Sequence, residues 1–376
     1  MKIIKNPFIT AGYISPEYFC NRDAESEQLI NEIINGNNLA LISTRRMGKT
    51  GLIQHCFQKK SIKADYYTFF VDIYASKSLR DFIFMLSKVI LETLKPHGKK
   101  VFHQFWDKVK SLQAGISFDM TGNPSFHLGL GDIQSPEATL DELFKYLAIA
   151  DKPCLIAIDE FQQITAYPEK NVEAILRTYI QQCTNAHFIF AGSQQHIVGN
   201  LFLSAARPFY QSVSMMHLGS IDLQEYTKFA KHHFEMNNKK ITAKTIEIIY
   251  NRFEGITWYV QKTVHILYTM TPVHGICKEE MIEEALRNVI DSFRYAYSET
   301  LFRLPEKQKE LLIAIAKEGN AQALTSGAFV KKYKLTSGSS VQAGLKGLLE
   351  KDFITKEKEF YKIYDKFLSV WLLENY

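Results

Sequence analysis

The pattern of hydrophobic and polar positions changes in kind near residue 222. Before that point, short apolar runs typical of buried strands alternate with segments whose apolar residues recur at helical spacing. The predicted strands are residues 37–44, 66–75, 154–161, 187–193 and 212–221. Strands that alternate with helices form a mostly parallel sheet covered on both faces, so residues 1–222 are predicted to be an α/β three-layer sandwich.

One segment of this first half has a different pattern. In residues 111–132, apolar and polar positions alternate, and Thr-Gly-Asn-Pro at 121–124 interrupts the alternation. This pattern predicts a β-hairpin that is inserted between two elements of the sandwich. We expect the hairpin to offer a surface for a partner.

Beyond residue 222, four consecutive segments show helical periodicity, which predicts an all-α helical domain over residues 223–303. Residues 304–376 then show the pattern of three short helices. These are followed either by a strand pair or by one strand that runs into a last helix. Three helices with such a β element indicate a winged-helix domain. The chain is therefore predicted to contain three domains.

The composition of the 376-residue chain limits the class of protein it can be and the compartment in which we expect it. A hydrophobic share of 46% allows ordinary cores, and a net charge of +5 does not by itself imply a nucleic-acid partner. The five cysteines are dispersed and lack C-x-x-C spacing, which supports neither a disulfide framework nor a zinc site. Because no signal peptide and no run of about 18 apolar residues is present, we expect a cytoplasmic protein without a membrane span.

The loop after the first predicted strand, "STRRMGKT" at 43–50, carries the first chemical signal. It matches the phosphate-binding pattern Gly-x-x-x-x-Gly-Lys-Ser/Thr, except that Ser43 stands where the first glycine is expected. A helix is predicted to begin here, and its first N–H groups attract anions because they are unpaired. Gly48 lets the backbone approach a phosphate, Lys49 reaches the β- and γ-phosphates, and Thr50 places its hydroxyl on Mg²⁺. The alternative is a basic loop on the surface.

Two later strands end in polar residues suited to phosphate hydrolysis. Asp159 would complete the Mg²⁺ shell, and Glu160 would polarise the water that attacks the γ-phosphate. Ser193, at the end of the next strand, is expected to sense the γ-phosphate, with Gln194 as the second choice. The alternative for Ser193 is a cap on the helix that follows.

Together these motifs resemble the P-loop ATPases of the AAA+ and STAND type, and within them the prokaryotic, archaeal-type family with a C-terminal winged helix. The resemblance covers nearly the whole chain and implies a P-loop NTPase fold that binds ATP with Mg²⁺. The segments similar to the family's N-terminal, Walker B, sensor and C-terminal motifs are "YFCNRDAESEQL" (18–29), "AIDEF" (157–161), "FAGSQQHI" (190–197) and "YKIYDKFLSVWLL" (361–373).

The resemblance also assigns residues to the nucleotide. It implies that Phe19 and Arg22 lie near the adenine. The nucleotide-binding set from the loop is Ser43, Arg45, Arg46, Met47, Gly48, Lys49, Thr50 and Gly51. One arginine of the Arg45–Arg46 pair is expected to contact phosphate or a partner and the other to brace the loop. The segment "AARPFYQ" (205–211) makes Arg207 a candidate stabiliser of γ-phosphate charge, in its own subunit or in the neighbour of a homo-oligomer. The alternative for Arg207 is a salt bridge.

The chain departs from the family pattern at four positions. Asn21 and Ser43 replace glycines, and Thr257 and Lys366 replace prolines. Thr257 lies in "FEGITWYVQ" (253–261), so nucleotide contacts from the helical domain are in doubt.

These motifs predict a slow, Mg²⁺-dependent ATPase that acts as a switch coupled to the winged helix. The alternative is a nucleotide-regulated DNA-binding or scaffold module with negligible hydrolysis. Residues 305–376 contain twelve lysines, no arginine and nine acidic residues, a net charge of +3. Specific readers of the major groove usually carry Arg, Asn or Gln on the recognition helix, where this chain offers Gln342. The winged helix is therefore predicted to bind either DNA, weakly, or a protein.

Overall fold

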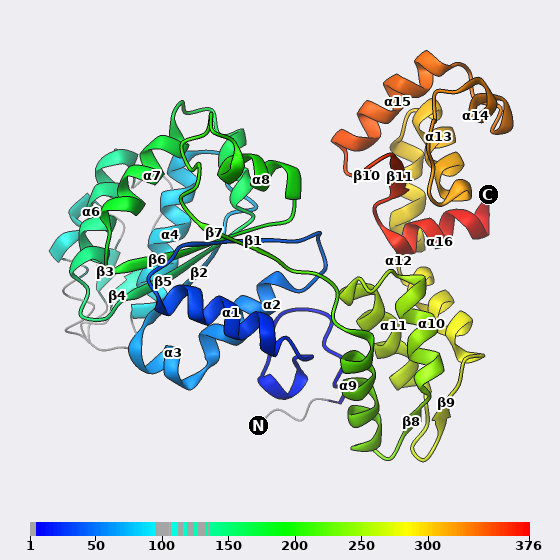
Figure 1. Cartoon of the computed structure of the whole chain (residues 1–376), viewed down its shortest axis with the longest axis horizontal. Coiled ribbons are helices and arrows are strands. Elements are labelled where there is room, and N and C mark those ends of the chain that lie inside the picture. Colours follow the sequence, from blue (N-terminus) through cyan, green and yellow to red (C-terminus); the bar gives the residue numbers. More distant parts are fainter. Residues whose placement is uncertain are drawn as a thin grey trace. The chain divides into compact units, whose positions relative to one another are not determined.

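The computed structural model describes residues 5–94, 105, 107–111, 116–118, 124–126, 133 and 135–376. The chain forms two compact units (Figure 1). One unit is Ala11–Ile221, and the other combines Met1–Thr10 with Asp222–Tyr376.

The first unit is built on a five-stranded sheet in the order β2-β5-β6-β1-β7, and every neighbouring pair is parallel. The strands are β1 (Leu39–Ile42), β2 (Tyr67–Asp72), β5 (Cys154–Asp159), β6 (Ala186–Gly192) and β7 (Ser214–His217). The register pairs Asp72 with Asp159, and Ile42 with Gly192. Since the strands are parallel, their carboxyl ends meet at one edge, which brings the predicted polar residues together.

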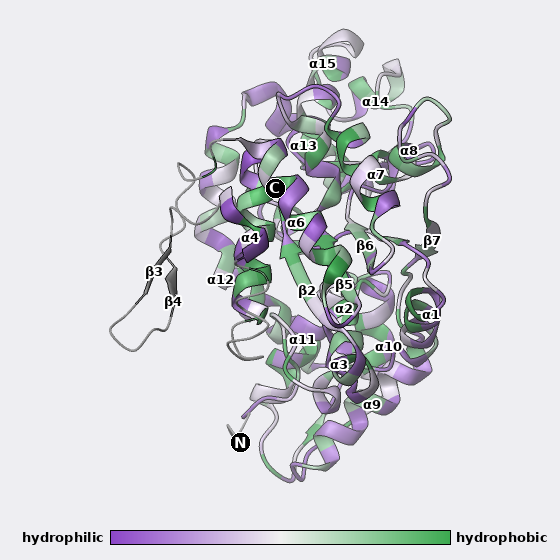
Figure 2. Cartoon of the chain, turned by 90° about the vertical axis from the view of Figure 1, so that its left-hand side faces the viewer, coloured by the Kyte–Doolittle hydropathy of each residue, from purple (hydrophilic) through white to green (hydrophobic). Residues whose placement is uncertain are grey.

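Alternate residues of the strands face two separate hydrophobic cores. Leu39 and Leu41 pack in one core, whereas Ala40 and Ile42 pack in the other. The first core is covered by α1 (Asp23–Ile34), α2 (Lys49–Gln58) and α3 (Lys60–Asp65), and a 3₁₀ turn, Pro16–Tyr18, precedes α1. The second is covered by α4 (Leu79–Leu94), α6 (Pro136–Ile149), α7 (Val172–Gln182), α8 (Gln195–Leu203) and the 3₁₀ helix η5 (Phe161–Ala166). Helices thus cover both faces of the sheet, and Figure 2 shows the apolar strands β2 and β5 in green among amphipathic helices.

Two short strands lie in the segment that was predicted to be a hairpin. β3 (Ile116–Phe118) pairs antiparallel with β4 (Pro124–Phe126), with Ile116 opposite Phe126. The rest of the predicted hairpin from 112 to 132 lies outside the described residues.

The second unit begins with four helices, α9 (Leu223–Glu235), α10 (Ala243–Arg252), α11 (Thr257–Met270) and α12 (Met281–Arg303). Three further helices follow, α13 (Glu306–Glu318), α14 (Gly327–Lys332) and α15 (Gly338–Glu350). β10 (Ile354–Glu357) then pairs antiparallel with β11 (Phe360–Ile363), and the last helix is α16 (Lys366–Asn375). The C-terminal region is thus a winged helix with both a strand pair and a last helix. The described part of the chain contains no helix long and apolar enough to cross a bilayer.

Two features of the second unit differ from the sequence prediction. β8 (Lys240–Ile241) pairs in parallel with β9 (Ile276–Cys277), although residues 223–303 were predicted to be all-α. Strands of two residues are too short to show periodicity in the sequence. Residues 5–10, predicted to belong to the ATPase domain, pack on the helices of the second unit instead. Phe8 is fully buried, and the side-chain amide of Asn6 donates to the carbonyl of His265 at 2.9 Å.

Candidate functional site

The loop between β1 and α2 has two residues in the left-handed region of backbone conformation. Gly48 has a φ of +95°, and Arg46 has a φ of +69°. At Gly48 an added Cβ would meet no atom within 4 Å, so the backbone here faces open space. Ser43 is not among the described residues with positive φ, so a serine fits there without strain. The Arg22 guanidinium braces the loop by donating to the carbonyl of Met47 at 3.1 Å.

Lys49, the first residue of α2, is buried with 6% of its surface exposed. Its ammonium donates to Ser43 Oγ at 3.2 Å. Burial lowers the pKa of Lys49, whereas the negative charges of Asp159 and Glu160 act in the opposite direction. A buried ammonium at a helix N-terminus, beside an open glycine backbone, is suited to binding phosphate.

Thr50 and Asp159 are brought together although they are 109 residues apart in the sequence. The Thr50 hydroxyl donates to Asp159 Oδ2 at 2.6 Å, and Asp159 is only 6% exposed. Burial raises the pKa of Asp159, and the hydrogen bond from Thr50 partly offsets this rise. A hydroxyl and a carboxylate are the oxygen ligands that Mg²⁺ accepts beside nucleotide phosphates. Within the described ranges, no three His, Cys, Asp or Glu side chains could hold a metal ion unaided.

Glu160 and Ser193 meet at the ends of β5 and β6. Ser193 Oγ donates to Glu160 Oε2 at 2.7 Å, and the Gln162 amide donates to the same oxygen. Arg45 Nε donates to Ser193 Oγ at 3.3 Å, so one arginine of the pair reaches the site. The alternative role of Ser193 as a helix cap is wrong, because no side chain caps α8 and Gln194 is its N-cap residue.

Gln162 belongs to this cluster, yet sequence reasoning missed it. A Cβ added at Gly192, at the end of β6, would collide with the side chains of Gln162 and Val198. Glycine is therefore needed at position 192, because a side chain there would have no room between the end of β6 and the side chains of η5 and α8. The available sequence signal was the position of Gln162, two residues after Glu160.

Half-buried aromatic rings lie beside the helix that follows the loop. Phe19 stacks on His55 of α2 with ring centroids 4.5 Å apart, and the Tyr13 hydroxyl lies 3.1 Å from His55 Nδ1. A Cβ added at Gly51 would lie 3.3 Å from the Phe19 ring, so Gly51 allows this close approach. Sequence reasoning selected Phe19 and Gly51 but missed Tyr13 and His55, whose spacing carries no motif.

Arg207 lies in a different set of contacts. Its guanidinium pairs with Glu173 at 2.6 Å and donates to Asn200 at 3.0 Å. The salt bridge that was its alternative role is therefore present. No described hydrogen bond joins Arg207 to the cluster of Asp159, Glu160 and Ser193, so any role at the γ-phosphate stays a prediction.

The sheet order, the loop between β1 and α2 and the acidic end of β5 define a P-loop-type α/β core, which is followed by helices and a winged helix. A family model described as a probable winged helix domain matches residues 295–374. No curated protein matches the chain in sequence.

Three of the solved structures that resemble this chain are from Pyrococcus abyssi and Aeropyrum pernix. A Walker-type ATPase of Pyrococcus abyssi has a TM-score of 0.67 and 19% identity, over 98% of this chain and 99% of that chain. The Aeropyrum pernix ORC2 protein, in its ADPNP-ADP complexes, has a TM-score of 0.59 and 15% identity, over 98% and 95%. The ORC1 protein of the same organism, in complex with DNA, has a TM-score of 0.51 and 13% identity, over 96% and 93%. At these identities the likeness shows the fold.

Proposed function

We propose that this protein binds ATP with Mg²⁺ at residues 43–50 and hydrolyses it slowly, as a switch coupled to the winged helix. The hydrogen bond from Thr50 to Asp159 carries the proposal, because it joins the loop to the acidic strand end beside a buried lysine. The adenine nucleotides named with the Aeropyrum pernix ORC2 structure support it at the level of the fold. Membership of the STAND class remains a prediction from the motifs.

Different residues of the site would bind the nucleotide and support its hydrolysis. Lys49 and the first N–H groups of α2 would bind the β- and γ-phosphates. Thr50 and Asp159 would hold Mg²⁺, which when bound neutralises negative charge on the phosphates. Glu160 would orient the attacking water and accept its proton, and Ser193 would contact the γ-phosphate.

The contacts of Glu160 support slow turnover. One of its carboxylate oxygens already accepts hydrogen bonds from Ser193 and Gln162. If this oxygen is the one that accepts the proton, Glu160 must exchange at least part of these contacts for a water molecule. The cost of this exchange would lower the rate of hydrolysis without weakening nucleotide binding.

Residues of the N-terminal motif at 18–29 would form the side of the site that faces the adenine. Phe19 offers a half-buried ring that is already stacked on His55. Arg22 is 3% exposed and bonded to Met47 and Glu25, so its proposed role is to hold the loop rather than to touch the adenine.

Nucleotide binding by matched lysine variants tests this proposal. Lys49→Ala removes the buried ammonium, and Lys60→Ala removes an exposed one at the start of α3. Loss of one charge-assisted hydrogen bond costs about 1.5–3 kcal/mol, so we expect Lys49→Ala to weaken binding of ATP about 10–100-fold. Lys60→Ala should bind as the wild type does. Equal affinity of all three proteins, or no binding by any, would contradict the proposal.

A further inference from the structure

The side-chain amide of Gln162 has one bonded atom and one atom without a partner. Its Nε2 donates to Glu160 Oε2, whereas its Oε1 is buried and has no hydrogen-bond partner among the described residues. Gln162 is only 4% exposed, so this oxygen is not solvated. An unpaired buried acceptor is uncommon in folded proteins and calls for an explanation.

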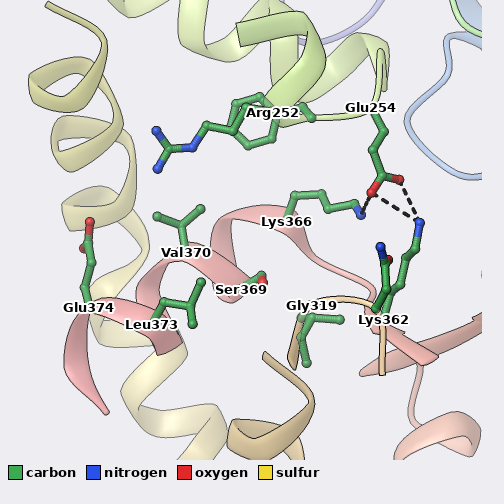
Figure 3. Close-up of a pocket in the computed structure, with 12 residues that line it drawn as sticks. Arg252, Glu254, Gly319, Lys362, Lys366, Ser369, Val370, Leu373 and Glu374 are labelled. Carbon is green, nitrogen blue, oxygen red and sulfur yellow. Dashed lines mark hydrogen bonds and ion pairs between the residues drawn. The ribbon is translucent and has the colours of Figure 1, made fainter. Parts of the chain in front are cut away.

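The charged cluster beside a cavity of about 420 Å³ in the second unit differs in this respect. There Lys362 and Lys366 both pair with Glu254, at 3.3 and 3.2 Å, as Figure 3 shows. Arg252, which also lines that cavity, pairs with Glu283. These charges satisfy one another, whereas the amide of Gln162 is only half satisfied.

The packing around Gln162 Oε1 indicates that Glu160 sets the orientation of the amide. A Cβ added at Gly192 would lie 2.5 Å from this oxygen and 2.4 Å from Val198, so Oε1 is packed against the end of β6. If the amide were turned over, its oxygen would face the Glu160 carboxylate, and two acceptors repel each other. Gln162 therefore donates to Glu160 and leaves its own oxygen unpaired.

Backbone strain is present at the same point of the chain. Glu160 has a φ of +57°, in the left-handed region that residues other than glycine adopt infrequently. Strained residues persist only where the surrounding structure holds them, and they cluster at functional sites. A strained backbone and an unpaired amide oxygen are thus both retained where the Glu160 carboxylate is held.

ATP would release one of the two donors on Glu160 Oε2 and leave the other in place. Ser193, which donates to this oxygen at 2.7 Å, is expected to turn to the γ-phosphate. The side chain of Gln162 has no acceptor besides Glu160 in the described part of the chain, so its release would leave both ends of a buried amide unpaired. Because unpaired buried polar groups are costly, we expect Gln162 to stay on Glu160 after Ser193 has left.

We propose that Gln162 is a positioning residue that acts through Glu160 and limits the rate at which bound ATP is hydrolysed. Since Ser193 is expected to contact the γ-phosphate, Oε2 is the carboxylate oxygen that faces the attacking water. The water proton passes to Oε2, the water oxygen bonds to the γ-phosphorus, and ADP leaves with the bridging oxygen. Gln162 must give up its hydrogen bond before Oε2 takes the proton. This role rests on the proposed ATPase function and makes Gln162 the residue that keeps the ATP-bound state long-lived.

Phosphate release in a single turnover, measured beside ATP affinity, tests this role on the full chain. Gln162→Met removes both amide atoms and keeps an unbranched side chain of similar length. We expect about 10-fold faster release at unchanged affinity, which damage to the fold would not produce. Gln163→Met is the matched control, because Gln163 is the next residue of η5 but donates to the Tyr74 carbonyl at 2.8 Å. Its rate should equal that of the wild type.

Two further variants complete the test. Gln162→Asn keeps the amide but shortens the side chain by one methylene, which withdraws the donor from Glu160, so it should also release phosphate faster. It decides the question if melting curves show that Gln162→Met is unfolded at the assay temperature. In a Glu160→Gln background, Gln162→Met should bring no gain, because Gln162 acts through the carboxylate.

The possible results separate the role of Gln162 from the proposed function. If the wild type hydrolyses ATP and the folded Gln162 variants release phosphate no faster, the role of Gln162 is overturned and the ATPase function stands. A gain that persists in the Glu160→Gln background overturns the role as well. A wild type that neither binds nor hydrolyses ATP overturns the proposed function, and the role of Gln162 with it.

Discussion

At the scale of single residues, Ser43 explains how a phosphate-binding loop can lack its first glycine. The two left-handed positions of the loop are Arg46 and Gly48, and Ser43 is at neither. Its hydroxyl instead accepts a hydrogen bond from Lys49 and donates one to the carbonyl of Thr44. The serine thus supplies a contact for the lysine at no cost in backbone strain.

Ser43→Gly should therefore change the affinity for ATP by less than about 3-fold. The new glycine gains nothing from its conformational freedom, because position 43 does not need a positive φ. In the nucleotide complex Lys49 would turn to phosphate and leave Ser43. Calorimetric titration of the variant with ATP and Mg²⁺ measures the change. A gain of 10-fold or more would mean that serine does impair the loop.

The ionised, buried side chain of Asp159 lowers the stability of the folded protein. Its proposed role in holding Mg²⁺ explains why a carboxylate is present there. Its pKa is raised by burial, so the folded state binds the proton more tightly than the unfolded chain does. The stability that comes from this proton is present below the ordinary pKa of 3.8 and is lost as the pH rises through the raised value. At neutral pH the buried, ionised Asp159 is therefore destabilising.

Asp159→Asn should raise the melting temperature of the nucleotide-free protein at pH 7. A gain of 1 kcal/mol corresponds to about 2–4 °C for a domain of this size. The gain should shrink as the pH falls and should disappear below 3.8, where Asp159 is protonated. The same variant should lose Mg²⁺-dependent ATP binding. A lower melting temperature at pH 7 would show that the charge of Asp159 stabilises the fold.

Sequence reasoning selected the members of the candidate site that lie at or just after strand ends, but it missed those that tertiary packing brings to it. Lys49, Asp159 and Ser193 follow apolar runs, and a parallel sheet brings such ends together. Gln162 and His55 have no comparable signal, because their partners Glu160 and Phe19 are fixed by tertiary packing. Sequence pattern therefore predicts the position of the site better than its full composition.

At the scale of elements, α16 is fixed to the α10–α11 turn by one buried ring. Phe367 is fully buried, with its ring centroid 4.9 Å from that of Tyr259 and 5.3 Å from that of Phe253. The Tyr259 hydroxyl accepts from the backbone N–H of Lys366 at 3.1 Å, while Asp365 caps α16. The segment 253–261, for which the sequence left nucleotide contacts in doubt, packs on the winged helix through Phe253 and Tyr259.

Phe367→Ala should destabilise the second unit by about 3–5 kcal/mol, the usual cost of deleting a fully buried phenylalanine side chain. Phe360→Ala is the matched control, because Phe360 lies on β11 with 37% of its surface exposed, and it should cost much less. Urea unfolding of both variants, followed by circular dichroism, measures the two costs. Similar values for the two positions would show that Phe367 does not fix α16.

The alternation of elements was predictable over most of the chain because each strand or helix is long enough to show its period. The exceptions have physical causes. β8 and β9 contain two residues each, and residues 5–10 are irregular, so neither carries a periodic signal. Residues 5–10 are placed by Phe8, whose ring contacts Phe234 and Tyr268. Such a contact between distant segments cannot be deduced from local pattern.

At the scale of the whole molecule, the proposed switch requires that nucleotide binding in the first unit changes its arrangement relative to the second. The five native cysteines are all buried, so cysteines introduced at exposed positions can be labelled selectively. Lys60→Cys in the first unit and Lys346→Cys in the winged helix form a suitable pair.

With fluorophores at these two positions, ATP and Mg²⁺ should change the energy transfer between the units. The change should persist in a Glu160→Gln background, where hydrolysis is blocked, and should be absent in a Lys49→Ala background. If ATP binds and the transfer efficiency does not change, the protein hydrolyses ATP without acting as a switch of this kind.

The central claim is that the loop at 43–50 binds ATP and that Glu160 drives its hydrolysis. The most direct measurement follows ATP binding and phosphate release side by side for the wild type, Lys49→Ala and Glu160→Gln. We predict slow release by the wild type, weakened binding by Lys49→Ala, and intact binding by Glu160→Gln with release reduced about 10²–10⁴-fold. Undiminished phosphate release by Glu160→Gln, or a wild type that binds no ATP, would contradict the claim.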